Sequence, residues 1–225
     1  LVKRKIFITS NLKNLNSIHN LKFLNINSKK IDKVIFSSVV PEVFKNIKKY
    51  LKKKLNLEAK ELKQFNLRKK LKIDVNKKQV GSDRLANAIS VINNKDNFII
   101  LDFGTATTFD VVLKNRYKGG IIAPGVNLSL KTLVEKAKLI PNIKLSKIKN
   151  IIGKNTQNAV KSGFYWGYQG LIKNLINLIE KKNKKKFKII FTGGLSHLYK
   201  NTIKKKIKVD KDLTIKGLLK LVVTE

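Results

Sequence analysis

The spacing of apolar residues along this chain predicts strands in some segments and helices in others, one after the other. In the first third, an apolar run over residues 31–37 predicts a buried strand, and residues 5–9 predict an earlier one. Pro41 is predicted to open a helix that ends at residue 55, because apolar side chains recur there every three or four positions while lysines fill the opposite face. Residues 62–80 are rich in lysine and have no strong period.

The rest of the chain begins with a predicted helix over residues 85–91 and continues with three short strands in a meander. The strands are predicted at 98–101, 109–113 and 120–123, followed by helices at 128–137, 156–179 and 212–219 and a strand at 188–191. Strands that alternate with helices in this way predict an α/β fold. No internal repeat or Gly/Ser-rich linker marks a domain boundary, and we expect one near Val91.

Composition narrows the class of protein. With 225 residues, of which 42% are hydrophobic, the chain can bury a substantial core in one or two compact domains. No apolar run approaches the roughly 20 residues that span a bilayer, and the basic start lacks the features of a signal peptide, so we expect a cytoplasmic protein. Cysteine is absent and there are only two histidines, so the chemistry must rest on carboxylates and other oxygen ligands.

The formal net charge of +36 invites comparison with nucleic-acid-binding proteins. Only four of the 50 basic residues are arginines, however, and the lysines are spread through every segment. Lysine supplies charge without the bidentate recognition that arginine provides. We therefore expect nonspecific adsorption to nucleic acid at low salt and no specific complex.

The most informative segment is residues 97–110, NFIILDFGTATTFD. An apolar strand ends there in Asp102, followed by Gly104 and Thr105, and a second strand then begins. A turn of this kind offers a flexible backbone with NH and OH groups, as a bound phosphate or a coordinated cation requires. The alternative is an ordinary hairpin whose threonines reflect strand preference. Asp110 is predicted to be an exposed carboxylate at a strand end.

A second segment, residues 81–88 with the sequence GSDRLANA, places Asp83 beside Arg84 at the entrance of a predicted helix. A carboxylate can accept a hydroxyl proton late in phosphoryl transfer, and an arginine can hold the carboxylate of an acidic substrate bidentately. The alternative is a helix N-cap aspartate that pairs locally with the arginine.

Together these segments belong to a series that resembles the type III pantothenate kinases, in order and approximate spacing, from about Ile31 to the end of the chain. The six motifs are GSDRLANA (81–88), DFGTATTFD (102–110), GGIIAPG (119–125), GKNT (153–156), GFYWGYQG (163–170) and FTGG (191–194). The resemblance implies two ribonuclease-H-like halves of the actin and sugar-kinase type, which we place at residues 1–91 and 92–225. It also implies a homodimer whose substrate site lies at the interface.

On the substrate side, the resemblance implies that Asp83 is the catalytic acceptor of the hydroxyl proton of pantothenate. Gly81, Ser82 and Arg84 belong to the same substrate-binding motif. Thr156 matches a threonine that contacts the substrate, and its alternative role is to cap the helix that follows.

On the nucleotide side, Thr105 matches a residue that contacts ATP, which arrives with Mg²⁺, and Asp102 matches the ligand of a monovalent cation, K⁺ or NH₄⁺. Oxygen ligands suit such hard cations. Gly104, Gly193 and Gly194 are expected to let the backbone approach the nucleotide.

An aromatic group in the second half offers a further candidate. Phe164, Tyr165, Trp166 and Tyr168 could stack on a base or an acyl chain, but packing and dimer contact are favoured. His197 follows the glycine pair and is expected to be a surface residue.

Two departures from the family pattern bear on activity. Methionine is absent even at position 1, and no Asp-x-Gly-Asn-Thr loop precedes Ile31, so a fragment without the first strand and its phosphate loop is expected. Where the family has an aromatic residue and then Asn-Pro-x-Glu, this chain has Asp74, Asn76, Lys77 and Gln79. A kinase for another small hydroxy acid is therefore one alternative. A catalytically silent regulator that binds nucleic acid or protein is another, although Asp83 and Asp102 argue against it.

Overall fold

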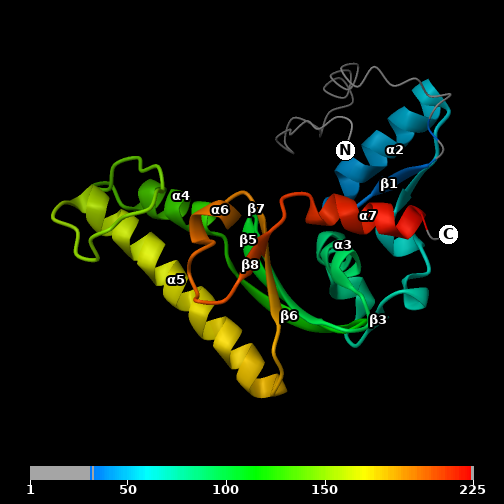
Figure 1. The fold of residues 1–225 in the computed structure, drawn as a ribbon. Coiled ribbons are helices and arrows are strands. Elements are labelled where there is room, and N and C mark those ends of the chain that lie inside the picture. Colours follow the sequence, from blue (N-terminus) through cyan, green and yellow to red (C-terminus); the bar gives the residue numbers. More distant parts are fainter. Residues whose placement is uncertain (1–30, 32, 224–225) are drawn as a thin grey trace.

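The computed structural model describes residue 31 and residues 33–223 (Figure 1). The strand predicted at residues 5–9 lies outside them. The described chain opens with strand β1 (Val34–Phe36), helix α2 (Pro41–Leu55) and strand β2 (Ala59–Glu61), and the two strands pair in parallel as a small sheet. The helix predicted from Pro41 to residue 55 is confirmed. It ends at Asn56, which adopts a left-handed conformation and donates its backbone N–H to carbonyls of the last turn.

A six-stranded sheet forms the centre of the larger part of the molecule. Its strands lie in the order β3 (Lys72–Ile73), β6 (Arg116–Pro124), β5 (Ala106–Leu113), β4 (Asn97–Phe103), β7 (Lys188–Gly193) and β8 (Ile207–Val209). β4, β5 and β6 form the predicted antiparallel meander, and β7 and β8 continue parallel to β4. A meander followed by two parallel strands is the arrangement of a ribonuclease-H-like half.

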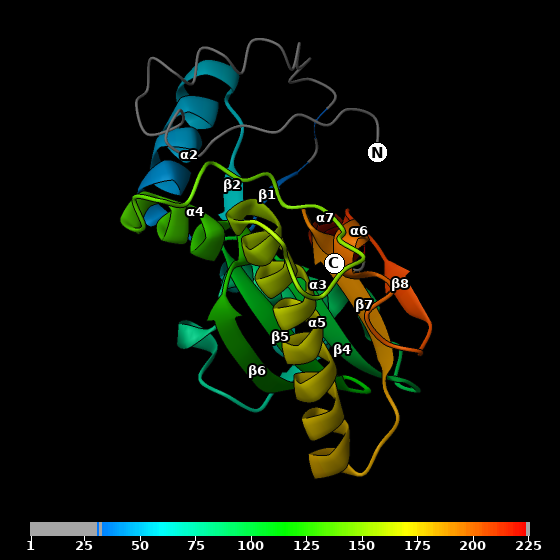
Figure 2. The same cartoon turned by 90° about the vertical axis from the view of Figure 1, so that its left-hand side faces the viewer.

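Helices cover both faces of this sheet (Figures 1 and 2). On one face, α3 (Ser82–Val91) and α7 (Leu213–Val222) pack against each other and over β4 and β6. On the other face lies the long helix α5 (Thr156–Asn183), together with α4 (Val126–Lys136) and α6 (Ser196–Tyr199). Each layer has its own apolar core because side chains alternate between the two faces of a strand.

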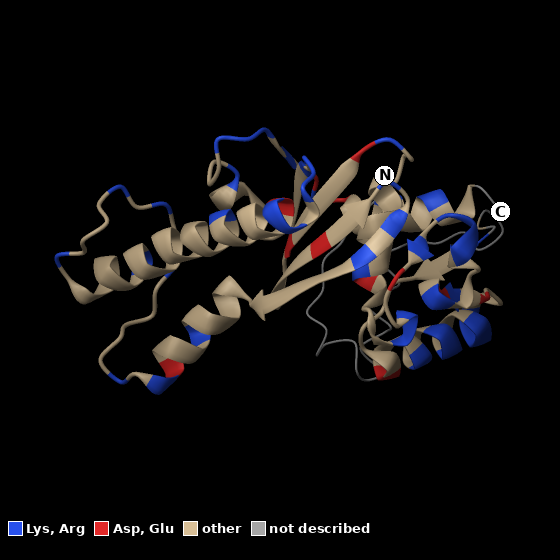
Figure 3. Ribbon diagram, turned by 90° about the horizontal axis from the view of Figure 1, so that it is seen from below, with Lys and Arg blue, Asp and Glu red and all other residues tan. Residues whose placement is uncertain are grey.

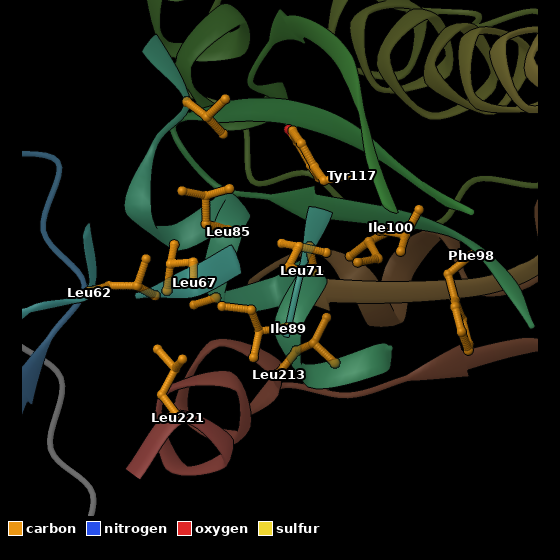
Figure 4. Close-up of a cluster of buried hydrophobic side chains, with 14 of the residues drawn as sticks. Leu62, Leu67, Leu71, Leu85, Ile89, Phe98, Ile100, Tyr117, Leu213 and Leu221 are labelled. Carbon is orange, nitrogen blue, oxygen red and sulfur yellow. The ribbon is translucent and has the colours of Figure 1, made fainter. Parts of the chain in front are cut away.

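The core under α3 and α7 includes residues from a segment that has no regular period in the sequence (Figure 4). Residues 62–80 form three short 3₁₀ turns, η4 (Leu62–Gln64), η5 (Leu67–Lys69) and η6 (Lys77–Gln79), as well as β3. Leu62, Leu67 and Leu71 are all buried there against α3. The irregular segment thus supplies the side chains that hold α3 in place.

The expectation of a division near Val91 stays a prediction. β3 precedes this position and pairs with β6 of the large sheet, and α3 packs on α7 from the C-terminal end of the chain. Lysines and arginines lie on helices, strands and loops throughout the molecule (Figure 3). Among the described residues, no helix is both long enough and apolar enough to cross a membrane.

Candidate active site at the start of α3

The start of α3 presents Asp83 and Arg84 from the first helical turn. Gly81 occupies the N-cap position, and a Cβ there would lie 2.4 Å from Oδ1 of Asp83, so a larger residue would displace this carboxylate from its present position. The same oxygen accepts the backbone N–H of Arg84 at 2.8 Å. Ser82 is buried beneath them, whereas the Asp83 side chain is half-buried and lies at the surface of the site.

The guanidinium of Arg84 pairs with a carboxylate far away in the sequence. Its Nε donates to Oδ1 of Asp110 at 2.8 Å, and Nη2 lies 2.7 Å from the same oxygen. A local side-chain pair between Arg84 and Asp83 was the alternative expected from the sequence, and it does not form. The prediction that Asp110 is exposed at a strand end is wrong: it lies within β5 and is fully buried.

Asp110 remains ionised only because charged and polar groups surround it. Burial raises its pKa to about 6, against the opposing effects of the Arg84 charge and of hydrogen bonds from Arg84 and Tyr117. The Tyr117 hydroxyl donates to Oδ1 at 2.6 Å, and burial beside this carboxylate raises the pKa of Tyr117 far above its usual value. At neutral pH Asp110 is therefore a buried carboxylate that faces the partly buried guanidinium of Arg84.

Asp102 lies near the end of β4, on the same side of the sheet as α3. Its Oδ2 accepts a hydrogen bond from Nδ2 of Asn87 at 3.0 Å, and the Thr214 hydroxyl donates to the side-chain oxygen Oδ1 of Asn87 at 2.8 Å. Burial raises the pKa of Asp102, and the nearby Asp83 raises it further, while the Asn87 bond lowers it. Fully buried Asn87 thus links α3, α7 and this strand end.

Two backbone turns meet beside Asp102. Phe103 of β4 pairs with Gly193 of β7, so the β4–β5 turn and the turn after β7 lie at the same edge of the sheet. Gly193 has a φ of +84°, and a Cβ there would lie 2.6 Å from Oδ1 of Asp102. Gly104 and Thr105 are exposed in the first turn, and Gly194 is exposed in the second. The predicted nucleotide-side residues therefore gather with Asp102.

A comparison with known proteins identifies the family. A family model described as type III pantothenate kinase matches residues 9–178. The type III pantothenate kinase of Pelagibacter ubique (strain HTCC1062) is 56% identical over 220 residues, which cover 98% of this chain and 89% of that protein. The chain belongs to the type III pantothenate kinase family. The type III pantothenate kinase of Sulfurihydrogenibium sp. (strain YO3AOP1) is 41% identical over 201 residues, or 88% of this chain and 79% of that protein.

Solved structures agree on the fold. A crystal structure of a Baf family transcriptional activator from Campylobacter jejuni covers 91% of this chain and 87% of its own, with a TM-score of 0.61 and 23% identity. The ethanolamine utilization protein EutJ from Carboxydothermus hydrogenoformans covers 100% of this chain and 78% of its own, with a TM-score of 0.50 and 12% identity. At these identities the likeness concerns the fold alone. The predicted α/β architecture of actin and sugar-kinase type is confirmed, and family membership makes the chain a kinase.

One candidate substrate-binding residue of this pantothenate kinase family member, Thr156, lies apart from the others. Thr156 is exposed at the first turn of α5, and the cap of that helix is Asn155, whose side chain accepts the backbone N–H of Asn158. The alternative role of Thr156 as the helix cap is therefore wrong. The start of α5 lies at the end of the molecule remote from α3, so one chain does not bring Thr156 to Asp83 (Figure 1).

The aromatic group on α5 packs into the molecule, as expected. Tyr165 is buried and stacks on Tyr199 with ring centroids 6.1 Å apart, and Phe164 stacks on Tyr168 at 6.0 Å. These rings join the core between α5 and the sheet. His197 is exposed on α6, as predicted.

A large groove of about 950 Å³ lies away from these residues. Its walls include Asp96 and Phe98 at the start of β4 and Lys188 at the start of β7, whereas Asp102 and Gly193 lie at the opposite ends of these strands. The groove is therefore separate from the candidate active site.

Sequence reasoning missed Asp110, Asn87 and Tyr117. The available signal for Asp110 was its position, because a carboxylate between Phe109 and Val111 in a strand pattern must either face water or find a buried partner. Among the described residues, no three His, Asp or Glu side chains converge as a metal-binding cluster. A cation near Asp102 would accordingly take most of its ligands from backbone, hydroxyl or substrate oxygens.

Proposed function

We propose that this chain transfers the γ-phosphoryl group of ATP to the hydroxyl of pantothenate, giving 4′-phosphopantothenate and ADP in the first step of coenzyme A synthesis. The observation that carries the proposal is the meeting of Asp83, Arg84 and Asp102 at one edge of the sheet, close enough for the Asp83 charge to raise the pKa of Asp102. Because the phosphate donor is ATP, we place the reaction in the cytoplasm.

In this proposal Asp83 orients the attacking hydroxyl and accepts its proton as the bond to phosphorus forms. A carboxylate is too weak a base to ionise an alcohol beforehand, but it can take the proton late in a loose transition state. Half-burial suits this role because the carboxylate stays accessible while its neighbours fix its direction. Arg84 binds the carboxylate of pantothenate, and Gly81 and Ser82 complete the substrate-binding turn.

The turns beside Asp102 fit a nucleotide with Mg²⁺. Exposed Gly104 and Thr105 offer backbone N–H and hydroxyl groups, and a Cβ at Gly194 would meet no other atom of the described residues within 4 Å. When bound, ATP with Mg²⁺ supplies the phosphoryl group and neutralises developing charge. We assign Asp102 to a monovalent cation, K⁺ or NH₄⁺, because a carboxylate whose pKa is raised by burial gains from a nearby positive charge.

We further propose a homodimer in which the partner subunit completes the substrate site. Thr156 cannot reach Asp83 within one chain, and two isoleucines near it in the sequence are exposed: Ile151 is 69% and Ile152 80% exposed. Farther along α5, a Cβ at Gly163 or Gly167 would meet no atom of the described residues within 4 Å, which leaves room there for the backbone of a second helix. Exposed apolar patches of this kind mark interfaces.

Mixing two inactive chains tests this shared site. We expect Asp83→Asn and Thr156→Arg chains to be inactive separately, because one lacks the proton acceptor and the other blocks the pantothenate site with a long side chain. Co-expressed in equal amounts, they should recover about a quarter of the wild-type rate, since half of the dimers are mixed and each mixed dimer holds one intact site. Recovery at the background level, with dimers confirmed by light scattering, would exclude a shared site.

Substrate choice has a specific alternative. Asp74, where the family has an aromatic residue, is held by Arg116 at 2.8 Å and Lys118 at 2.6 Å, which makes this region more polar. A different small hydroxy acid is therefore the second candidate substrate. ADP release with ATP, Mg²⁺ and K⁺ should depend on pantothenate and exceed the release with lactate, glycerate or pantoate. Faster release with one of these acids would replace pantothenate as the substrate.

A further inference from the structure

We propose that Asp110 is a positioning residue that fixes the guanidinium of Arg84 for the substrate carboxylate. This inference rests on the proposed function, in which Arg84 binds pantothenate. Asp110 is fully buried and cannot touch the substrate itself. It acts through Arg84, whose side chain is 13% exposed and thus lies between the buried carboxylate and the surface.

The contacts fix one edge of the guanidinium. Nε and Nη2 of Arg84 both lie within 2.8 Å of the same oxygen of Asp110. A guanidinium carries five N–H donors in a rigid plane, so donors on its other edges stay available for a second acceptor. An arginine on a free surface samples many rotamers and must lose that freedom when it binds a ligand. Here the chain itself restricts the side chain before the substrate arrives.

The strand opposite Asp110 has the shape that this arrangement needs. Gly120 pairs directly with Asp110, and a Cβ at Gly120 would lie 2.5 Å from Nη2 of Arg84 and 2.0 Å from a backbone oxygen. Any larger residue would push the guanidinium off the sheet. Gly120 in the middle of β6 therefore makes room for Arg84.

A bulge in the same strand brings Tyr117 to Asp110. The register shifts between Val111 and Val112, so that Gly119 faces Val111 but Tyr117 faces Val112, and Gly119 has a φ of +103°. Without the extra residue, Tyr117 would point to the other face of the sheet, because side chains alternate along a strand. With the bulge, its hydroxyl donates to Asp110 at 2.6 Å.

Stability alone does not account for such a construction. Burying a carboxylate and an arginine costs desolvation that their attraction only about offsets, and well-packed apolar residues often serve equally well. Yet three separate elements supply the groups that meet here. Helix α3 contributes Arg84, strand β5 contributes Asp110, and strand β6 contributes Tyr117 and Gly120. A geometric role for the guanidinium explains why these groups converge.

The test compares pantothenate with its neutral alcohol analogue, in which a hydroxymethyl group replaces the carboxylate. We expect Asp110→Asn to raise the KM for pantothenate about 10- to 100-fold, the range that a charge-assisted hydrogen bond supports, with little change in kcat or in the KM for ATP. The preference for the acid over the alcohol, taken as the ratio of kcat/KM values, should fall by a similar factor. If Asp110 had a purely structural role, Asp110→Asn would lower kcat/KM equally for the acid and for the alcohol, and this ratio would stay unchanged.

Tyr117→Phe provides a second, milder variant, since it keeps the ring and the ion pair and removes only the donated hydrogen bond. It should shift the acid-to-alcohol ratio in the same direction by about 3-fold. If circular dichroism shows that Asp110→Asn does not fold, the result for Tyr117→Phe decides between a positioning role and a purely structural one. A wild-type ratio in the folded variants would overturn the inference while the kinase assignment stands. A wild-type enzyme that turns over neither compound would instead overturn the proposed function.

Discussion

Replacing Asp83 by asparagine should lower kcat by at least about 100-fold, because the amide has nearly the same shape as the carboxylate but cannot accept the hydroxyl proton. The backbone N–H of Arg84, which Asp83 accepts at 2.8 Å, can still be accepted by the amide oxygen, so the first turn of α3 should keep its structure. The KM for ATP should change little, since we propose that ATP binds at the β4–β5 turn and at the turn after β7. Steady-state kinetics with both substrates measures each effect.

Asp96→Asn is the matched control for this variant. Asp96 is an aspartate in an ion pair with Lys188 at the opposite end of β4, beside the separate groove. The same chemical change there should leave kcat within about twofold of wild type, because surface ion pairs contribute little. If Asp83→Asn retained more than a tenth of the wild-type kcat, another residue would have to be the proton acceptor.

Gly217→Ala should destabilise the fold. Gly217 lies on α7 where this helix crosses α3, and a Cβ there would lie 1.9 Å from the backbone oxygen of Ala86. Forcing the helices apart costs about 1–3 kcal/mol or more, against about 1 kcal/mol gained from the better helix propensity of alanine. The upper part of this range leaves a net loss of about 1–2 kcal/mol, and at about 2–4 °C per kcal/mol for a chain of this size the unfolding temperature should fall by roughly 2–8 °C. Activity should fall with it, because α3 carries Asp83.

Leu219→Ala tests whether this effect is specific to the helix crossing. Leu219 belongs to the same helix but is 60% exposed, so its truncation should change the free energy of unfolding by about 0.5 kcal/mol or less. Thermal unfolding followed by circular dichroism compares the two variants. A Gly217→Ala protein as stable as wild type would mean that α3 and α7 can separate without loss, and that the position of Asp83 does not depend on this contact.

Periodicity predicted the regular elements well and the irregular ones poorly. The helix α2 and the meander of β4, β5 and β6 follow from apolar spacing, because their patterns are long enough to distinguish a period of two from one of 3.6. Strands β3 and β8 have two and three residues and leave no such pattern. Their pairing with distant strands decides their conformation, and that pairing is not a local property of the sequence.

The candidate site was predicted as a set of residues but not as a network. Motif spacing placed Asp83 and Asp102 in the site, and both lie at the same edge of the sheet. The partner of Arg84 was missed because Asp110 lies 26 positions away and its burial depends on a glycine in the facing strand. The sequence does hold that signal in the Gly-Gly pair of residues 119 and 120, but a strand pattern alone does not say which neighbour needs the space.

The most direct test of the assigned reaction is to identify its product. The full chain is incubated with ATP, Mg²⁺, K⁺ and pantothenate, in parallel with Asp83→Asn. The products are separated by chromatography, and mass spectrometry identifies and quantifies them. We expect ADP and 4′-phosphopantothenate in equal amounts with the wild-type chain and at least about 100-fold less of both with the variant. ADP without phosphorylated pantothenate, or equal product from the two proteins, would contradict it.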